Sequence, residues 1–188
     1  NLAQLFREQG FYNKAQPLFQ RSLDIRKNVL GPDHPDTAEV LNNLAQLFRE
    51  QGLYDKAQPL FQRSLDIRKN SFGPDHPETA SALNNLAQLF RDQGLYDKAQ
   101  TLFQRSLDIN EKVLGPHHPD TATALEKLAQ LFVEQGLYIK AQLLFQRSLD
   151  IREKVLGPDH PDTAIVLTNL AFINNKHGLY SKAQRLYR

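Results

Sequence analysis

The chain has 188 residues, 23 of them basic and 21 acidic, so its formal net charge is only +2. No block of like charges occurs, which argues against nucleic acid or an anionic membrane as a partner. The chain contains no cysteine, which excludes disulfides, thiolate metal sites and cysteine nucleophiles.

The sequence shows no signal for secretion and no membrane-spanning segment. No apolar run approaches membrane-spanning length, no signal peptide opens the chain, and no Asn-x-Ser/Thr sequon occurs. We therefore expect a cytoplasmic protein. The chain begins at Asn1 and contains no methionine, which favours a segment of a longer protein.

One unit of 42 residues is copied along the chain. Glycine recurs at this spacing in two series: Gly10, Gly52, Gly94, Gly136 and Gly178, and then Gly31, Gly73, Gly115 and Gly157. A fixed period of this size indicates a stacked array, in which each unit buries its apolar face against its neighbours. The sequence therefore predicts a single domain, residues 1–188, without internal boundaries.

We expect about five units in this domain: 1–31 (partial), 32–73, 74–115, 116–157 and 158–188 (partial). The copies 1–42 and 43–84 differ at only seven positions, so recurrence of a residue is not independent support for a function. Neither end of the array looks capped. Each should expose an apolar face, which predicts end-to-end self-association.

The first helix of the central unit carries apolar residues at helical spacing. These residues are Leu41, Leu44, Ala45 and Phe48. Gly52 supplies the C-terminal stop of this helix, because glycine accepts the backbone conformation that often ends a helix.

The second helix is predicted from about Asp55 to about Ser71, with Pro59 in its opening turns, where the lost donor costs least. Its expected buried face consists of Ala57, Leu60, Phe61, Ser64 and Leu65. A turn from Gly73 to His76 follows. Pro77 should begin the next helix, because its fixed φ suits the first helical position.

The residue pattern of the unit resembles that of a known family. Its core reads Leu41-x2-Leu44-Ala45-x2-Phe48, Gly52-x-Tyr54 and Ala57-x3-Phe61, and the motif LGPDHPDT stands at 30–37 and 156–163. This combination resembles the kinesin light chain type of tetratricopeptide repeat (TPR), with the extra residues in a longer second helix and in the linker. The resemblance implies an all-α, right-handed superhelical solenoid of antiparallel helix pairs.

The last two units depart from the pattern of the others. Glu126-Lys127 replaces Asn-Asn, and Val133 replaces arginine. In the fifth unit, Asn174 stands where a phenylalanine is usual and Phe172 where a glutamine is usual. Terminal repeats are often atypical, because they face a different neighbour.

No residue pattern proposes an enzyme or a cofactor. The recurring serines lie in the second helices without a histidine nearby in those helices: Ser22, Ser64, Ser106 and Ser148. We expect them to pack between helices, where a serine can bond back to its own helix carbonyl and remain satisfied. No glycine-rich phosphate loop occurs either.

One histidine recurs in every linker. These histidines are His34, His76, His118 and His160. Stacked helices stand on the order of 10 Å apart, whereas a metal needs its imidazole nitrogens at about 2 Å. We therefore predict no metal site, and a structural role in which each histidine bonds to neighbouring backbone.

The resemblance implies that the polar faces of the first helices line a concave groove that receives an extended peptide. Carried onto this sequence, the groove positions are Asn42, Asn43, Gln46 and Arg49; Asn84, Asn85, Gln88 and Arg91; Glu126, Lys127 and Gln130; and Asn169 and Phe172. A carboxamide both donates and accepts, so a ladder of asparagines can pair with a peptide backbone.

Two other interpretations of this polar face stay open. The amides are then solvated, or bond between neighbouring helices, and recur only because the units were copied. The charge of the ligand is also open: the arginines of this face favour an acidic peptide, but acidic residues beside them partly cancel this preference. The arginines are Arg7, Arg49 and Arg91, and the acids are Glu8, Glu50 and Asp92.

The sequence thus predicts a scaffold for protein–protein interaction that binds a peptide segment of a partner. The alternative from another class is a structural or self-assembling array whose contacts run end to end. An array that regulates an enzyme would need a catalytic domain outside these residues. RNA binding ranks lower, because such surfaces need more basic charge.

Overall fold

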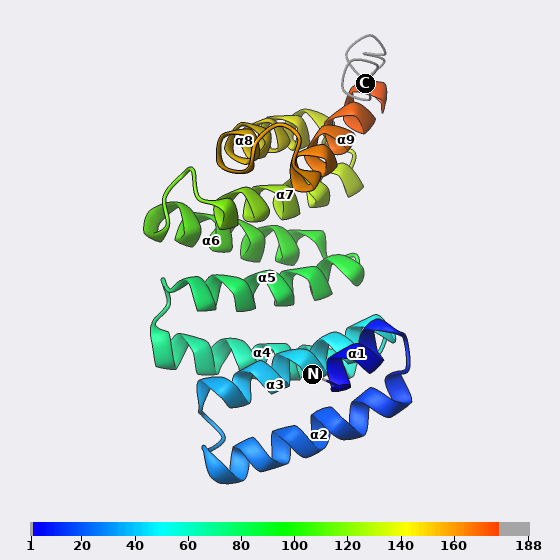
Figure 1. The fold of residues 1–188 in the computed structure, drawn as a ribbon, viewed down its shortest axis with the longest axis vertical. Helices are drawn as coiled ribbons and strands as arrows, with labels where there is room; N and C mark the ends of the chain where they lie inside the picture. Colours follow the sequence, from blue (N-terminus) through cyan, green and yellow to red (C-terminus); the bar gives the residue numbers. More distant parts are fainter. Residues whose placement is uncertain (1, 177–188) are drawn as a thin grey trace. The chain divides into compact units, whose positions relative to one another are not determined.

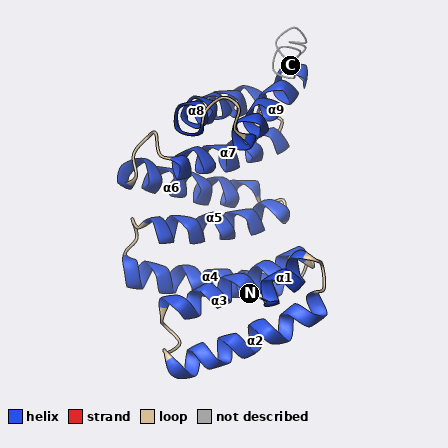
Figure 2. Ribbon diagram, in the orientation of Figure 1, coloured by secondary structure: helices blue, strands red, loops and turns tan. Residues whose placement is uncertain are grey.

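The computed structural model describes residues 2–176, and every regular element in this range is an α-helix (Figures 1 and 2). Contacts within the chain divide it into two compact units, Asn1–Leu95 and Tyr96–Arg188. Each unit is described by itself. Residues 177–188 lie outside the described residues, and so does the expected glycine of the fifth unit, Gly178.

The first unit contains α1 (Leu2–Glu8), α2 (Tyr12–Val29), α3 (Pro35–Glu50), α4 (Tyr54–Phe72) and α5 (Pro77–Asp92). Each helix packs against the next one along the chain. In addition, α3 contacts α5, so the first helices of successive repeats lie side by side.

The second unit contains α6 (Tyr96–Val113), α7 (Pro119–Glu134), α8 (Tyr138–Leu156) and α9 (Pro161–Lys176). Here too each helix packs against the next one, with α7 and α8 in the most extensive contact (Figure 1). Within residues 2–176, no helix combines the length and the apolar character needed to cross a bilayer.

The observed helix ends agree with the predicted ones to within a residue or two. The first helix stops at Glu50, and Gly52 follows with φ at 72°, a conformation that glycine adopts without strain. The second helix is Tyr54–Phe72, and the next begins at Pro77 as predicted.

The apolar positions predicted for the first helix are confirmed as core: Leu41, Leu44, Ala45 and Phe48 are all buried. On α4, Ala57, Phe61, Ser64 and Leu65 are buried as expected. Leu60, however, is only half-buried. At 100° per residue it lies at the edge of the stripe that these four residues form, so the neighbouring helices cover it incompletely.

The linker histidines cap the helices that follow them. Nδ1 of His34 accepts a hydrogen bond from the backbone N–H of Asp36 at 3.1 Å. The same bond, at the same length, recurs at His76, His118 and His160. This bond satisfies a donor that the first helical turn leaves unpaired. The expected backbone role of these histidines is confirmed.

A threonine closes each linker from the other side. Its Oγ1 donates to the carbonyl oxygen of the linker glycine six residues earlier, at 2.7–2.9 Å. The pairs are Thr37 with Gly31, Thr79 with Gly73, Thr121 with Gly115, and Thr163 with Gly157. All four threonines are fully buried. Each linker is therefore fixed by two hydrogen bonds, one from each side.

Three of the recurring serines, Ser64, Ser106 and Ser148, are buried between helices as predicted, and Ser22 is half-buried. At Ser64 and Ser148 the hydroxyl bonds to another helix and not to its own helix carbonyl. Oγ of Ser64 donates to the carbonyl oxygen of Ala38 at 2.8 Å, across the contact with α3 instead of within α4. Oγ of Ser148 bonds to Oε1 of Glu126 at 2.5 Å, again in the preceding helix. The close approach of the paired helices brings these acceptors within reach.

Candidate functional site

In the first unit, the residues expected to line a groove lie along α3 and α5. We call this set the polar strip: Asn42, Asn43, Gln46 and Arg49 on α3, with Asn84, Asn85, Gln88 and Arg91 on α5. Asn42 is buried, and the other seven are half-buried. The strip is therefore partly accessible to solvent and partly buried in the protein.

Two asparagines of the polar strip bond to each other across the contact between α3 and α5. Nδ2 of Asn85 donates to Oδ1 of Asn42 at 2.7 Å. The side chain of Asn42 therefore links the two helices. The side-chain oxygen of Asn85 takes no part in this bond and can accept from another donor. Oδ1 of the neighbouring Asn84 is buried and finds no hydrogen-bond partner among the described residues.

The arginines of the strip reach to the following repeat. Nη1 of Arg49 donates to Oε1 of Gln88 at 2.8 Å, and its Nε lies 3.6 Å from Oδ2 of Asp92. Arg7 repeats the arrangement one repeat earlier: it donates to Oε1 of Gln46, and its Nε lies 3.8 Å from Oε1 of Glu50. An arginine thus joins the ends of adjacent first helices.

This pairing sets the electrostatics of the polar strip. The cation of Arg49 is offset by the acid of the next repeat, Asp92, and not by its sequence neighbour Glu50, which faces Arg7. Asp92 also lies 3.3 Å from Nη2 of Arg91. Charge at the strip is therefore largely balanced within the protein. This geometry does not favour recognition by attraction to an acidic ligand.

In the second unit, the remaining predicted groove positions lie on α7 and α9. Lys127 and Gln130 are half-buried on α7. On α9, Asn169 is half-buried and Phe172 is exposed, with Nζ of Lys176 lying 5.6 Å from the centre of its ring. The position that carries glutamine on α3, α5 and α7 therefore carries an exposed aromatic ring on α9.

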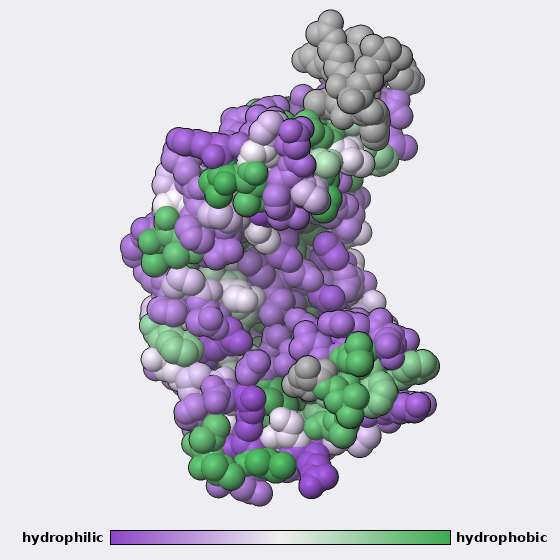
Figure 3. Space-filling view, viewed as in Figure 1, coloured by the Kyte–Doolittle hydropathy of each residue, from purple (hydrophilic) through white to green (hydrophobic). Residues whose placement is uncertain are grey.

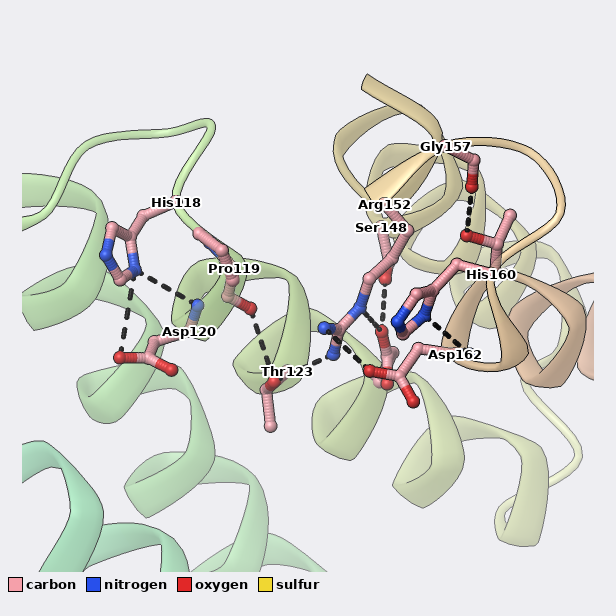
Figure 4. A network of polar contacts seen from close by, with 11 residues as sticks. His118, Pro119, Asp120, Thr123, Ser148, Arg152, Gly157, His160 and Asp162 are labelled. Carbon is pink, nitrogen blue, oxygen red and sulfur yellow. Dashed lines mark hydrogen bonds and ion pairs between the residues drawn. The ribbon is translucent and has the colours of Figure 1, made fainter. Parts of the chain in front are cut away.

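Glu126 is half-buried on α7, and its carboxylate is engaged within the protein. Its carboxylate contacts α8, where Oε1 lies 3.0 Å from Nε of Arg152. Nη2 of Arg152 also donates to Oγ1 of Thr123 at 2.9 Å, and its Nη1 lies 3.5 Å from Oδ2 of Asp162 (Figure 4). One buried guanidinium therefore links α7, α8 and the start of α9.

Sequence reasoning missed two of these features. The hydrogen bonds from a threonine to each linker glycine, called threonine clasps below, were visible in the sequence as a threonine six residues after each of these glycines. The ionic network was visible as a paired change: the positions equivalent to Glu126 and Arg152 hold asparagine and arginine in one earlier unit, Asn42 and Arg68, and two asparagines in the next, Asn84 and Asn110. Only the 126–152 pair has opposite charges.

A family model for the tetratricopeptide repeat matches the chain in overlapping segments, residues 1–70, 47–109, 81–154 and 134–188. The chain belongs to the tetratricopeptide repeat family. TPR proteins mediate protein–protein interaction and bind protein partners, and they are typically non-enzymatic scaffolds. Among curated protein sequences, none matches this chain.

Two solved structures are similar to this chain over nearly its whole length. BtubC (BKLC) from P. vanneervenii is 25% identical, with a TM-score of 0.84 over 98% of this chain and 74% of that one. A second structure, that of the nearly identical TPR-like repeats of a Podosopora anserina putative kinesin light chain, shares 23% sequence identity with this chain. Its TM-score is 0.81, and the match covers 99% of this chain and 88% of that one. The fold is therefore an all-α TPR solenoid, and the resemblance to repeats of the kinesin light chain type is confirmed.

Proposed function

We propose that the polar strip on α3 and α5 binds an extended peptide segment of a protein partner. The observation that carries this proposal is the Asn85–Asn42 bond at 2.7 Å, which fixes the carboxamide of Asn85 in the strip. A pre-positioned amide loses little conformational freedom on binding, so its hydrogen bonds add more to affinity. The family's general role in protein–protein interaction supports the same proposal.

The ligand is recognised mainly by hydrogen bonds to its backbone. Asn43 and Asn85 are half-buried carboxamides, each able to donate and to accept. The arginines next to them already pair with Gln88, Asp92 and their equivalents one repeat earlier. Binding should therefore depend weakly on salt, because no large unpaired charge attracts the peptide.

The test is a selection of random displayed peptides against the chain, repeated with a variant carrying Asn43→Ala, Asn85→Ala and Arg91→Ala. The matched control carries Asn28→Ala, Asn70→Ala and Arg21→Ala, three exposed positions on α2 and α4. Peptides that bind the wild type and the control but lose at least tenfold in affinity for the strip variant support the proposal. A selection that enriches nothing, or peptides that bind all three proteins equally, would overturn it.

A further inference from the structure

In the first unit, an arginine joins the first helices of successive repeats. Nη1 of Arg49 on α3 donates to Oε1 of Gln88 on α5, and Nε of Arg49 lies 3.6 Å from Oδ2 of Asp92 at the end of α5. The same two contacts recur one repeat earlier, where the arginine is Arg7. We call this set of three side chains, an arginine on one first helix with a glutamine and an acid on the next, the arginine bridge.

Between α7 and α9, all three members of the arginine bridge are replaced. The arginine position holds Val133, the glutamine position holds Phe172 and the acid position holds Lys176. Replacement of the arginine alone would leave the glutamine and the acid of the next repeat without their partner. The joint replacement avoids this, because valine and phenylalanine side chains need no hydrogen bond. The three changes therefore belong together, and they put apolar side chains where the earlier repeats have a polar contact.

We call Val133, Phe172 and Lys176 the α7–α9 site, and this site is open to solvent. Val133 is half-buried in the last turn of α7. Phe172 is 42% exposed, and Nζ of Lys176 lies over its ring, 5.6 Å from the centre. Figure 3 shows hydrophobic residues among hydrophilic ones on the visible face of α9, whereas hydrophilic residues dominate the visible face of α5. An exposed aromatic ring at a position that elsewhere holds an amide is typical of a contact surface.

The accessibility of the α7–α9 site comes from the packing of the repeat and not from the extent of the chain. On α3, the position of Phe172 is held by Gln46. This helix has α4 packed on it and α5 beside it, and Gln46 is still half-buried. The position of Val133 is held on α3 by Arg49, which is half-buried in the same surroundings. Helices that flank these positions therefore leave their side chains within reach of a ligand.

We propose that the α7–α9 site binds an apolar side chain of the partner's peptide segment. This inference rests on the proposed function, since it takes the ligand to be a peptide, and it names the class of side chain that the second unit selects. The apolar surfaces of Phe172 and Val133 gain free energy when an apolar side chain displaces water from them. A polar side chain would lose its own water there, because neither residue offers its side chain a hydrogen bond.

The size of the site favours a peptide over a second copy of the chain. A stable contact between two folded proteins buries about 1,200 Å² or more. The α7–α9 site consists of two apolar side chains and one cation, which is far less surface. A single well-placed side chain, by contrast, can supply much of the affinity of an extended segment.

The test selects random displayed peptides on the wild type and then measures the affinity of each enriched peptide for variants by fluorescence anisotropy. We expect the enriched peptides to share an apolar residue and to lose about tenfold or more in affinity for a bridge variant. Serine in place of that shared residue should weaken binding to the wild type but hardly change binding to the bridge variant. The bridge variant carries Val133→Arg, Phe172→Gln and Lys176→Glu, the residue types of the arginine bridge.

A matched control makes the same three kinds of change at exposed positions of α8. It should bind the peptides as the wild type does, and an equal loss in this control overturns the inference. The control carries Ile139→Arg, Leu143→Gln and Lys154→Glu. If the bridge variant loses its helical circular dichroism, Phe172→Gln alone takes its place.

The strip variant of the previous test separates this inference from the proposed function. Peptides that bind the bridge variant as tightly as the wild type overturn the inference, and the proposed function stands if they lose affinity for the strip variant. Peptides that lose affinity for the bridge variant alone support the inference and contradict the role of the polar strip. A selection that enriches no peptide overturns both. A wild type that dimerises in analytical ultracentrifugation, when the bridge variant does not, assigns the site to a second copy and overturns the inference.

Discussion

Nε of Arg152 lies 3.0 Å from Oε1 of Glu126, and this ion pair stands where another repeat has two asparagines. The side chain of Arg152 is only 10% exposed and that of Glu126 23%. Ser148, Thr123 and Asp162 satisfy further atoms of the pair. A pair this well satisfied ties α7, α8 and the start of α9 together, and its members should depend on each other.

Removal of one charge from this pair should therefore destabilise the protein more than removal of both. We expect Glu126→Asn to lower the free energy of unfolding by about 2 kcal/mol, because the guanidinium of Arg152 loses its closest acceptor while it stays buried. The double variant Glu126→Asn/Arg152→Asn restores the asparagine pair of Asn84 and Asn110 and should lose less. Urea denaturation measures both values. A double variant whose loss equals the sum of the losses measured for Glu126→Asn alone and for Arg152→Asn alone would contradict this coupling.

The linker histidines should stabilise the protein as helix caps. His118→Ala removes the acceptor of the bond to the N–H of Asp120 at 3.1 Å, and should cost about 1 kcal/mol. His118→Asn should retain most of the stability, because asparagine is among the preferred capping residues. Thermal and urea unfolding of the two variants provide the comparison. Equal losses in both would mean that the imidazole acts in another way.

The threonine clasp should matter through its hydroxyl and not through its shape. Thr79→Val keeps the volume but removes the donor to the carbonyl oxygen of Gly73, which lies at 2.7 Å. We expect a loss of about 1–2 kcal/mol, because the carbonyl oxygen of the half-buried Gly73 is left without this donor. Thr79→Ser keeps the bond and loses only a methyl group. Urea unfolding should therefore rank the wild type first, the serine variant second and the valine variant last.

The balance of charge at the polar strip predicts an effect on ligand choice. Asp92→Asn removes the acid that faces Arg49 and Arg91 at 3.6 and 3.3 Å. We take peptides enriched by the wild type and extend them by one glutamate. At low salt, each extended peptide should bind the Asp92→Asn variant several-fold more tightly than it binds the wild type, and this difference should vanish at high salt. Fluorescence anisotropy at two salt concentrations measures this. Asp24→Asn on α2 serves as the control, and an equal gain there would show that only net charge matters.

The sequence by itself determined the repeat, the helix ends and the family. These follow from local chemistry: the period of the apolar residues, glycine after Glu50, and proline at the first position of α5 are all properties of short segments. The backbone role of the linker histidines was also predictable, because the histidine and the helix it caps adjoin in the chain.

Only the tertiary structure decided the partners of the polar side chains. The period of 42 residues made Glu126 equivalent to Asn42 and Asn84, yet its carboxylate pairs with Arg152, 26 residues away. Likewise, Arg49 bonds to Gln88 and lies near Asp92 of the next repeat, and it does not pair with its sequence neighbour Glu50. The reason is physical: helix periodicity gives a side chain its face, but packing between helices decides which charges and amides come within hydrogen-bond distance.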